Sequence, residues 1–196
     1  RRVGLVTGTT TERAQPLLSP TYYVARALAP FADVREPKAG TTEAINALLA
    51  EKVSVLILAD VGALDKATTR KVEDFVEQGG VLVRFAGSRL AAGNDDLVPV
   101  RLRRGGRNLG GSLSWEAPKT LTPFPQGSPF AGLSVPQETT VRRQILAEPD
   151  GDLTDRTWAA LADGTPIVTA ARRGEGLIVL FHVTAEIPVF LQSFAL

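Results

Sequence analysis

Three side chains of this chain could together perform nucleophilic catalysis: the hydroxyl of Ser88, the imidazole of His182 and the carboxylate of Glu186. A serine nucleophile needs a base within hydrogen-bond reach and a third group that orients the base. His182 is the only histidine in the chain, so no other imidazole could act as this base. Ser88 follows Gly87, but the sequence lacks the Gly-x-Ser-x-Gly elbow of serine hydrolases. We therefore interpret Ser88 as a serine of a loop or a helix N-terminus. A hydrolase that uses Ser88 and His182 is the alternative.

A second candidate site is a run of hydroxyl side chains, Thr9, Thr10 and Thr11, directly after the first predicted strand. Such a loop binds phosphate when a helix N-terminus follows at once and points its N–H groups at the anion. Here the first helix-start signal, Ser19-Pro20, comes well downstream. A solvated loop is the simpler interpretation. The loop does lie at the predicted carboxyl edge of the sheet, where doubly wound folds bind ligands, so a small-ligand sensor is a further alternative.

The acidic residues do not predict a metal site. Asp60, Asp65, Asp95 and Asp96 have no spacing that is typical of metal ligands. Asp65 is better explained as the N-cap of a helix, and Asp95-Asp96 as part of a polar loop. The chain has no cysteine, which excludes disulfides, thiolate metal sites and thiol nucleophiles. We expect no metal and no cofactor.

The charge of the chain does not favour nucleic acid or a membrane surface as the partner. The net charge is +1, and no run of about 18 apolar residues is present that could insert into a bilayer. Aromatic residues, which nucleic-acid sites interleave with basic clusters, make up only 6% of the chain. The densest basic cluster is Arg101, Arg103, Arg104 and Arg107. We interpret it as protection of an edge strand or as a contact with a neighbouring domain. We expect the partner to be another domain of the same chain or another protein.

Residues 53–88 predict the elements that would position these side chains. Residues 53–59 are a continuous apolar run, which is typical of a strand covered on both faces. Asp65 predicts the start of a helix, and Gly79-Gly80 its left-handed stop. Residues 81–85 predict the next strand. Phe85-Ala86-Gly87-Ser88 then forms the turn at which an α/β enzyme would display its nucleophile. Strands and helices that alternate at this spacing predict a parallel, doubly wound sheet.

The rest of the chain extends this pattern. Before residue 53 we predict strands at 2–7 and 32–35, a helix from Ser19-Pro20 and a helix capped by Thr41 or Thr42. The inner face of the first helix would carry Val24, Ala27, Leu28 and Phe31. Residues 89–150 are rich in Gly, Pro and Arg and predict a β-rich insertion, with strands near 98–103, 110–115 and 140–147. Residues 157–161 predict a short strand or a helical turn, and 166–171 with 177–183 a hairpin.

Four segments carry a resemblance to a known family: Leu58-Ala59-Asp60-Val61, residues 75–83 (FVEQGGVLV), residues 161–166 (LADGTP) and residues 174–185 (GEGLIVLFHVTA). They resemble the class I glutamine amidotransferase-like domain of bacterial membrane proteins with an N-terminal double-transmembrane region, related to the aerotolerance (Bat-type) proteins. The resemblance implies an α/β fold, a three-layer sandwich with a mainly parallel sheet of the amidotransferase-like or flavodoxin-like type. It also implies a membrane-anchored bacterial parent with von Willebrand A-type neighbours, with this domain in solution beside the membrane.

The catalytic residues of that family are not matched here. Class I amidotransferases use Cys, His and Glu, with the Cys on the strand-to-helix elbow. The elbow corresponds to Phe85-Ala86-Gly87, which has no thiol. His182 follows a late strand, as the family's histidine does, but Glu186 comes four residues later instead of two. We therefore predict one domain over residues 1–196, excised from a longer protein. We favour a binding or interaction module over an enzyme.

Overall fold

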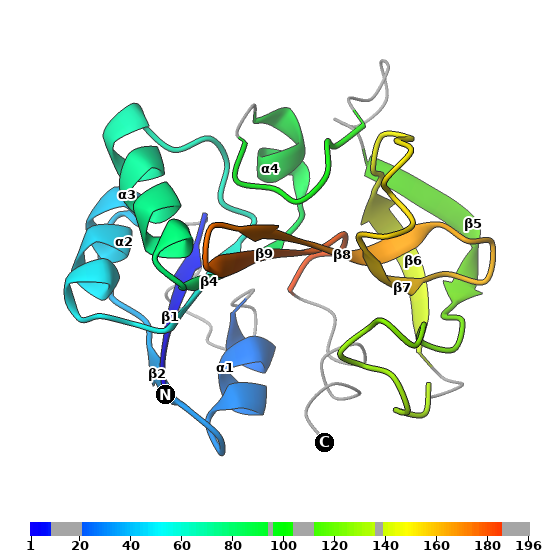
Figure 1. The fold of residues 1–196 in the computed structure, drawn as a ribbon, viewed down its shortest axis with the longest axis horizontal. Coiled ribbons are helices and arrows are strands. Elements are labelled where there is room, and N and C mark those ends of the chain that lie inside the picture. The colour runs from blue at the N-terminus through cyan, green and yellow to red at the C-terminus, as the bar shows by residue number, and fades with distance from the viewer. Residues whose placement is uncertain (9–20, 94–95, 104–111, 136–138, 186–196) are drawn as a thin grey trace.

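The fold is built on one seven-stranded sheet (Figure 1). The computed structural model describes residues 1–8, 21–93, 96–103, 112–135 and 139–185. Across the sheet the strands follow the order β2-β1-β3-β4-β9-β8-β7. Their bounds are β1 Arg2–Thr7, β2 Asp33–Arg35, β3 Val55–Ala59, β4 Val81–Phe85, β7 Thr157–Ala160, β8 Pro166–Arg173 and β9 Gly176–Phe181. A separate two-stranded sheet pairs β5 (Ser112–Thr120) with β6 (Thr140–Ile145).

The seven-stranded sheet is mixed. The four pairings that join β2, β1, β3, β4 and β9 are parallel, whereas β8 pairs with both β9 and β7 in antiparallel fashion. Only residues 174–175 separate β8 from β9. A connection this short cannot hold a crossover helix, so the two strands form a hairpin, as the sequence predicted.

The predicted fold class is wrong. An amidotransferase-like or flavodoxin-like sandwich around a mainly parallel sheet does not describe a mixed sheet whose last strands are antiparallel. The second, two-stranded sheet is also separate from the first. The hairpin was predicted, but the predicted fold class followed from the family resemblance and from the strand–helix alternation before residue 86, and the hairpin adds antiparallel strands to the sheet.

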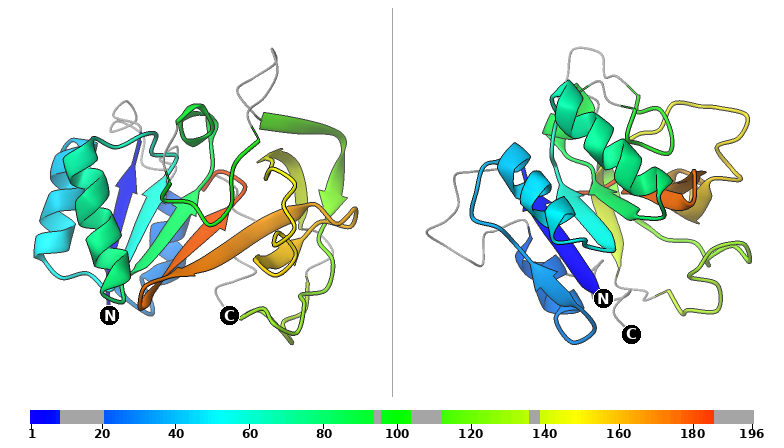
Figure 2. Two further views of the ribbon diagram at one scale, coloured as in Figure 1. Left: turned by 45° about the horizontal axis from the view of Figure 1, so that its top comes forward. Right: turned by 60° about the vertical axis from the view of Figure 1, so that its left-hand side comes forward.

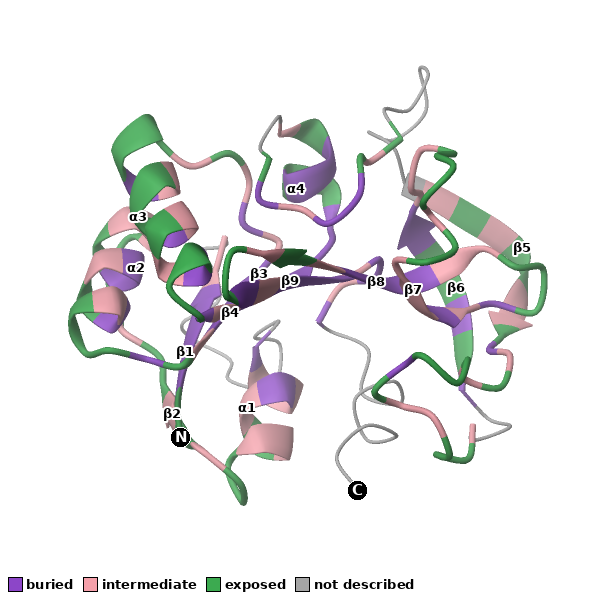
Figure 3. Ribbon diagram, viewed as in Figure 1, coloured by how far each residue is buried: buried purple, intermediate pink, exposed green. Residues whose placement is uncertain are grey.

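Helices cover both faces of the parallel strands, because alternate strand residues are apolar on both sides. On one face α2 (Thr41–Ala50) and α3 (Lys66–Glu77) pack side chains such as Leu48 and Val72 against Leu56 and Leu58 of β3. On the other face α1 (Tyr22–Leu28) packs Val24 near Ile57. The figures show α2 and α3 side by side, with α1 across the sheet from them (Figure 2). Buried residues accordingly follow the central strands (Figure 3).

The ends of α3 form as the sequence predicts. The Asp65 carboxylate accepts hydrogen bonds from the backbone N–H groups of Ala67 and Thr68, at 3.0 and 2.9 Å. The pKa of Asp65 is lowered, chiefly because the Thr68 hydroxyl also donates a hydrogen bond to the charged carboxylate. The two backbone N–H groups lower it further. At the other end Gly79 has φ = 102°, the left-handed conformation that stops the helix.

Three local predictions are wrong. The N-cap of α2 is Gly40 and makes no side-chain cap bond, while the Thr42 hydroxyl donates to Asp65 instead. Phe31 lies beyond the end of α1 and is 70% exposed, so it is not on a buried face. Residues 98–103 form no strand and contribute only the bridge between Leu102 and Ala147. The predicted start of the first helix at Ser19-Pro20 lies outside the described residues.

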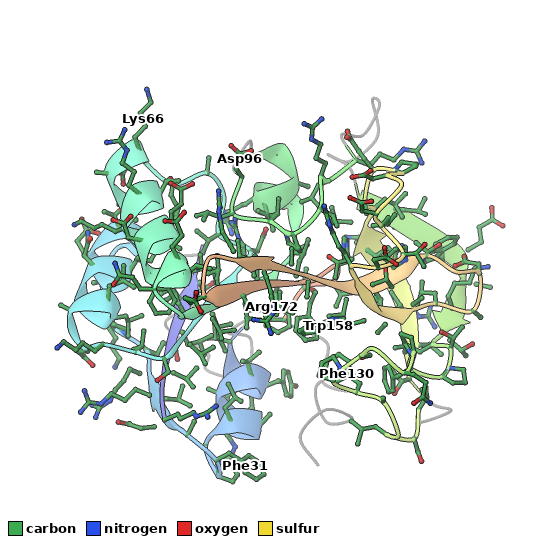
Figure 4. All side chains as sticks on the ribbon, viewed as in Figure 1. Phe31, Lys66, Asp96, Phe130, Trp158 and Arg172 are labelled. Carbon is green, nitrogen blue, oxygen red and sulfur yellow. The ribbon has the colours of Figure 1, made fainter. Side chains whose placement is uncertain are left out.

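The β5–β6 ribbon occupies the far end of the main sheet, beyond β8 and β7. Val141 of β6 belongs to the same hydrophobic core cluster as residues of β7 and β8, such as Ala159 and Ile167. Aromatic rings extend this cluster. The rings of Phe130 and Trp158 make a T-shaped, edge-to-face contact, with ring centroids 6.2 Å apart (Figure 4). Trp158 lies in β7, so residues 157–160 of the predicted segment 157–161 form a strand and not a helical turn.

Close packing of the β8–β9 hairpin against the end of α3 predicts that Gly176 cannot carry a side chain. A Cβ there would overlap the carbonyl oxygens of Val76 and Gly80. We expect Gly176→Ala to lower the free energy of unfolding by about 1–3 kcal/mol, because the backbone must move to make room. Urea denaturation measures the change. Gly151→Ala is the control, since a Cβ at Gly151 meets nothing within 4 Å. Equal stabilities of the two variants would contradict this packing.

Candidate functional site

The candidate site is the carboxyl edge of the parallel strands, where the sequence places its chemistry-bearing residues. Gly8 follows β1, Asp60 follows β3, Ser88 follows β4 and His182 follows β9. In α/β folds with parallel strands ligands bind at this edge. The loops that meet here are held close together, since Gly8 N–H donates to the Ala59 carbonyl at 3.0 Å and Asp60 N–H to the Phe85 carbonyl at 3.0 Å.

Asp60 is the residue around which these loops are packed. It has φ = 47°, a left-handed conformation that aspartate tolerates better than most residues. Its Oδ1 accepts the backbone N–H groups of Arg89 and Leu90, at 3.0 and 3.1 Å, and so caps the short helix α4 (Ser88–Ala92). The Arg89 guanidinium lies 4.0 Å from its Oδ2. Two free N–H groups of α4 are therefore already satisfied by a carboxylate of the same chain.

Two glycines are required by this arrangement. A Cβ on Gly8 would overlap the backbone oxygen of Asp60, and a Cβ on Gly87 would overlap its carboxylate. The turn at Gly87, which resembles a nucleophile elbow in sequence, is thus shaped to admit the Asp60 carboxylate. Ser88 is the first residue of α4 and is exposed to solvent.

His182 is not at the surface with Ser88 but fully buried. Its Nδ1 lies 2.8 Å from the Ile145 carbonyl oxygen, and its Nε2 lies 3.0 Å from the Thr169 hydroxyl. A carbonyl can only accept, so Nδ1 carries the proton and the neutral Nε2 accepts from Thr169. The backbone of His182 is engaged too, since its N–H donates to Ile167 and its carbonyl accepts from Ile145, at 2.9 and 2.8 Å.

Burial keeps this imidazole neutral. Desolvation lowers the pKa of His182 to about 4, although the hydrogen bond to the Ile145 carbonyl acts in the opposite direction. Both ring nitrogens have partners, so neither is available to take a proton from Ser88. The structure therefore does not bring Ser88 and His182 together as nucleophile and base. Glu186, the third member of the predicted triad, lies outside the described residues.

The remaining predicted site residues do not form a site in the described part of the chain. Thr9, Thr10 and Thr11 lie outside it, as does Asp95. Asp65 caps a helix, and Asp96 only offers its backbone carbonyl to Arg173, at 3.3 Å. Among the residues that the structure describes, no three His, Cys, Asp or Glu side chains are grouped so that they could hold a metal.

Sequence reasoning missed the most deeply buried charge, Arg84 on β4, which is 0% exposed. Its guanidinium donates to the backbone carbonyls of Val61 and Leu97, at 2.7 and 3.3 Å. It thereby ties the loops after β3 and after α4 to the sheet. A charged residue that interrupts the apolar run of residues 81–85 was the available signal. Asp60 was considered only as a metal ligand, and its cap on α4 depends on contacts that the sequence does not show.

The cap predicts unequal effects of two substitutions at Asp60. Asp60→Ala removes the acceptor of two backbone N–H groups, and we expect it to cost about 1–2 kcal/mol of unfolding free energy. Asp60→Asn keeps an acceptor oxygen and a residue type that tolerates φ > 0, so its loss should be much smaller. Urea denaturation compares the two. Similar losses in both variants would mean that the negative charge, and not the cap geometry, matters.

The buried neutral imidazole predicts a dependence of stability on pH. Because the pKa of His182 is about 4 in the folded state and near 6.5 when unfolded, the unfolded chain binds the proton first as the pH falls. Stability should fall between pH 6.5 and 4, by ~3 kcal/mol in total. His182→Gln should lose this slope between pH 6.5 and 5, above the range where carboxylates dominate. A slope that survives in His182→Gln would contradict the assignment.

No family model matches the chain, and it matches no curated protein. The fold is similar to several solved structures. A cytoplasmic protein of Salmonella typhimurium LT2 has a TM-score of 0.72 and 10% identity, over 98% of this chain and 93% of that chain. A second Salmonella typhimurium cytoplasmic protein has a TM-score of 0.62 and 11% identity, over 94% and 88%. A β-galactosidase of the haloarchaeon Halorubrum lacusprofundi has a TM-score of 0.63 and 13% identity, over 99% of this chain.

These identities show a shared fold and nothing about activity. The chain spans only 29% of the β-galactosidase chain, so the similarity covers one part of that larger protein. The three similar structures named above are two cytoplasmic proteins and a β-galactosidase, and none is a flavodoxin, which is a second finding against the predicted fold class.

Proposed function

We propose that this chain is a non-catalytic binding or interaction module. The observation that carries the proposal is the state of His182, the only histidine. Its ring is fully buried, both nitrogens are engaged by Ile145 and Thr169, and its pKa is lowered to about 4. A general base must reach the proton that it removes and must titrate near the working pH. His182 does neither.

The environment of Ser88 supports the same proposal. An acyl-transfer site needs N–H donors that are free to stabilise an oxyanion. At α4 the N–H groups of Arg89 and Leu90 already donate to the Asp60 carboxylate. A negative charge that developed beside Ser88 would meet this carboxylate. The hydrolase alternative with Ser88 and His182 therefore has little support from the geometry. The sensor alternative rests on Thr9 to Thr11 and stays a prediction.

We propose that the partner is another domain of the same chain or another protein. One similar structure supports this view, because the matching segment of the Halorubrum lacusprofundi β-galactosidase is a part of a much longer polypeptide. A membrane-anchored bacterial parent is a further proposal, which rests on the sequence resemblance alone. Within the described segments no helix is long and apolar enough to cross a membrane.

A hydrolysis assay tests the proposal. We expect the purified protein to hydrolyse neither glutamine nor a panel of p-nitrophenyl esters faster than Ser88→Ala does. Ser88 is exposed, so Ser88→Ala should keep the fold. The proposal fails if turnover is found that Ser88→Ala abolishes while circular dichroism shows an unchanged structure.

A further inference from the structure

An open groove lies between the C-terminal halves of α2 and α3, on the opposite edge of the sheet from the carboxyl edge. Its volume is about 730 Å³, within the range of small-molecule sites. The two helices that line it run side by side (Figure 2). Leu49 of α2 and Phe75 of α3 line it and are only partly buried against the core. Phe75 lies so close to Gly80 that a Cβ there would overlap the ring. The groove therefore has an apolar lining that the chain itself does not cover.

Hydrogen-bond donors gather where the two helices end. Lys52, Ser54 and Gln78 line this end of the groove, and all three are exposed. Earlier in the two helices, the Lys71 ammonium donates to Asn46 Oδ1 at 2.7 Å and so bridges them. Lys52 has no such bond, and it takes part in no ion pair within the described residues. Lys52 therefore lines the groove without an ion-pair partner among the described residues.

The backbone conformation of Lys52 is a second observation that points to a role of its side chain in binding. Both helices end in the same kind of turn. In α2 the N–H groups of Lys52 and Val53 donate to Leu49 and Leu48, and α3 repeats the pattern at its own end. The left-handed residue is Gly79 in α3, with φ = 102°, but Lys52 in α2, with φ = 55°. Glycine is favoured at this position, and a lysine there is strained. The chain thus has a strained lysine, and not glycine, at a position whose side chain lines the groove.

We propose that this groove binds a small apolar molecule that ends in a single carboxylate. The carboxylate binds the Lys52 ammonium, with Ser54 and Gln78 as further donors, and the apolar body packs on Leu49 and Phe75. Asp74 also lines the groove and disfavours a second negative charge on the ligand. The inference rests on the proposed function, since it names a ligand class for a binding module.

Titration with 4-phenylbutyrate, followed by ¹H–¹⁵N NMR, tests the proposal. We expect saturable shifts at residues 46–54 and 71–80, and weaker binding of the uncharged 4-phenylbutyramide. Lys52→Met should weaken phenylbutyrate about twofold to fivefold, the range for one exposed ion pair. Lys66→Met is the matched control: Lys66 is an exposed lysine at the opposite end of α3 (Figure 4) and should leave the affinity unchanged.

Lys52→Gly separates ligand binding from a structural role. Glycine relieves the left-handed strain, so the melting temperature should stay the same or rise while phenylbutyrate affinity falls. A fall in melting temperature with unchanged affinity would show that Lys52 only stabilises the helix end. Shifts outside the groove, or equal affinity of Lys52→Met and the unaltered protein, would also overturn the proposal. Neither result touches the non-catalytic assignment, which only the hydrolysis assay decides.

Discussion

The buried imidazole of His182 joins parts of the chain that lie far apart in the sequence. Through its ring and backbone it binds Ile145 at the end of β6, Ile167 and Thr169 in β8, and it directly follows β9. Two of these hydrogen bonds attach the β5–β6 ribbon, through Ile145, and the other two bind His182 to β8 of the main sheet, at a point that water does not reach. A buried polar group that loses its partners is costly, so the ribbon and the sheet can be expected to keep this register. The residue that most resembles a catalytic base is therefore a structural junction.

The same use of polar groups is seen at the carboxyl edge of the sheet. Asp60 caps α4, and Arg84 binds the loops after β3 and α4 through their carbonyls. Both charged side chains are thus bound to the chain's own backbone. This edge is where α/β folds usually hold their chemistry, but here its described residues stabilise the fold. The groove between α2 and α3 differs, because its apolar lining and the Lys52 ammonium are not covered by the chain.

Sequence reasoning succeeded where the interactions are local. The Asp65 cap needs only the N–H groups two and three residues later, and the stop at Gly79 needs only a residue that accepts φ > 0. The hairpin of β8 and β9 follows from the short connection between two apolar runs. It failed where distant partners decide. Thr42 was predicted as a possible cap but donates a hydrogen bond to Asp65 instead. Residues 98–103 were predicted as a strand, but their β-pairing is a single bridge between Leu102 and Ala147.

The helices and strands up to β4, the lack of any thiol and the single possible imidazole base could all be derived from the amino-acid sequence. Periodicity and composition are properties of neighbouring residues and depend little on the tertiary arrangement. Three features depend on long-range contacts: the mixed sheet, the Asp60 carboxylate that fills the elbow at Gly87, and the burial of His182 against Ile145 and Thr169. The reason is physical. Reactivity depends on solvation and hydrogen-bond partners, which come from segments tens of residues away.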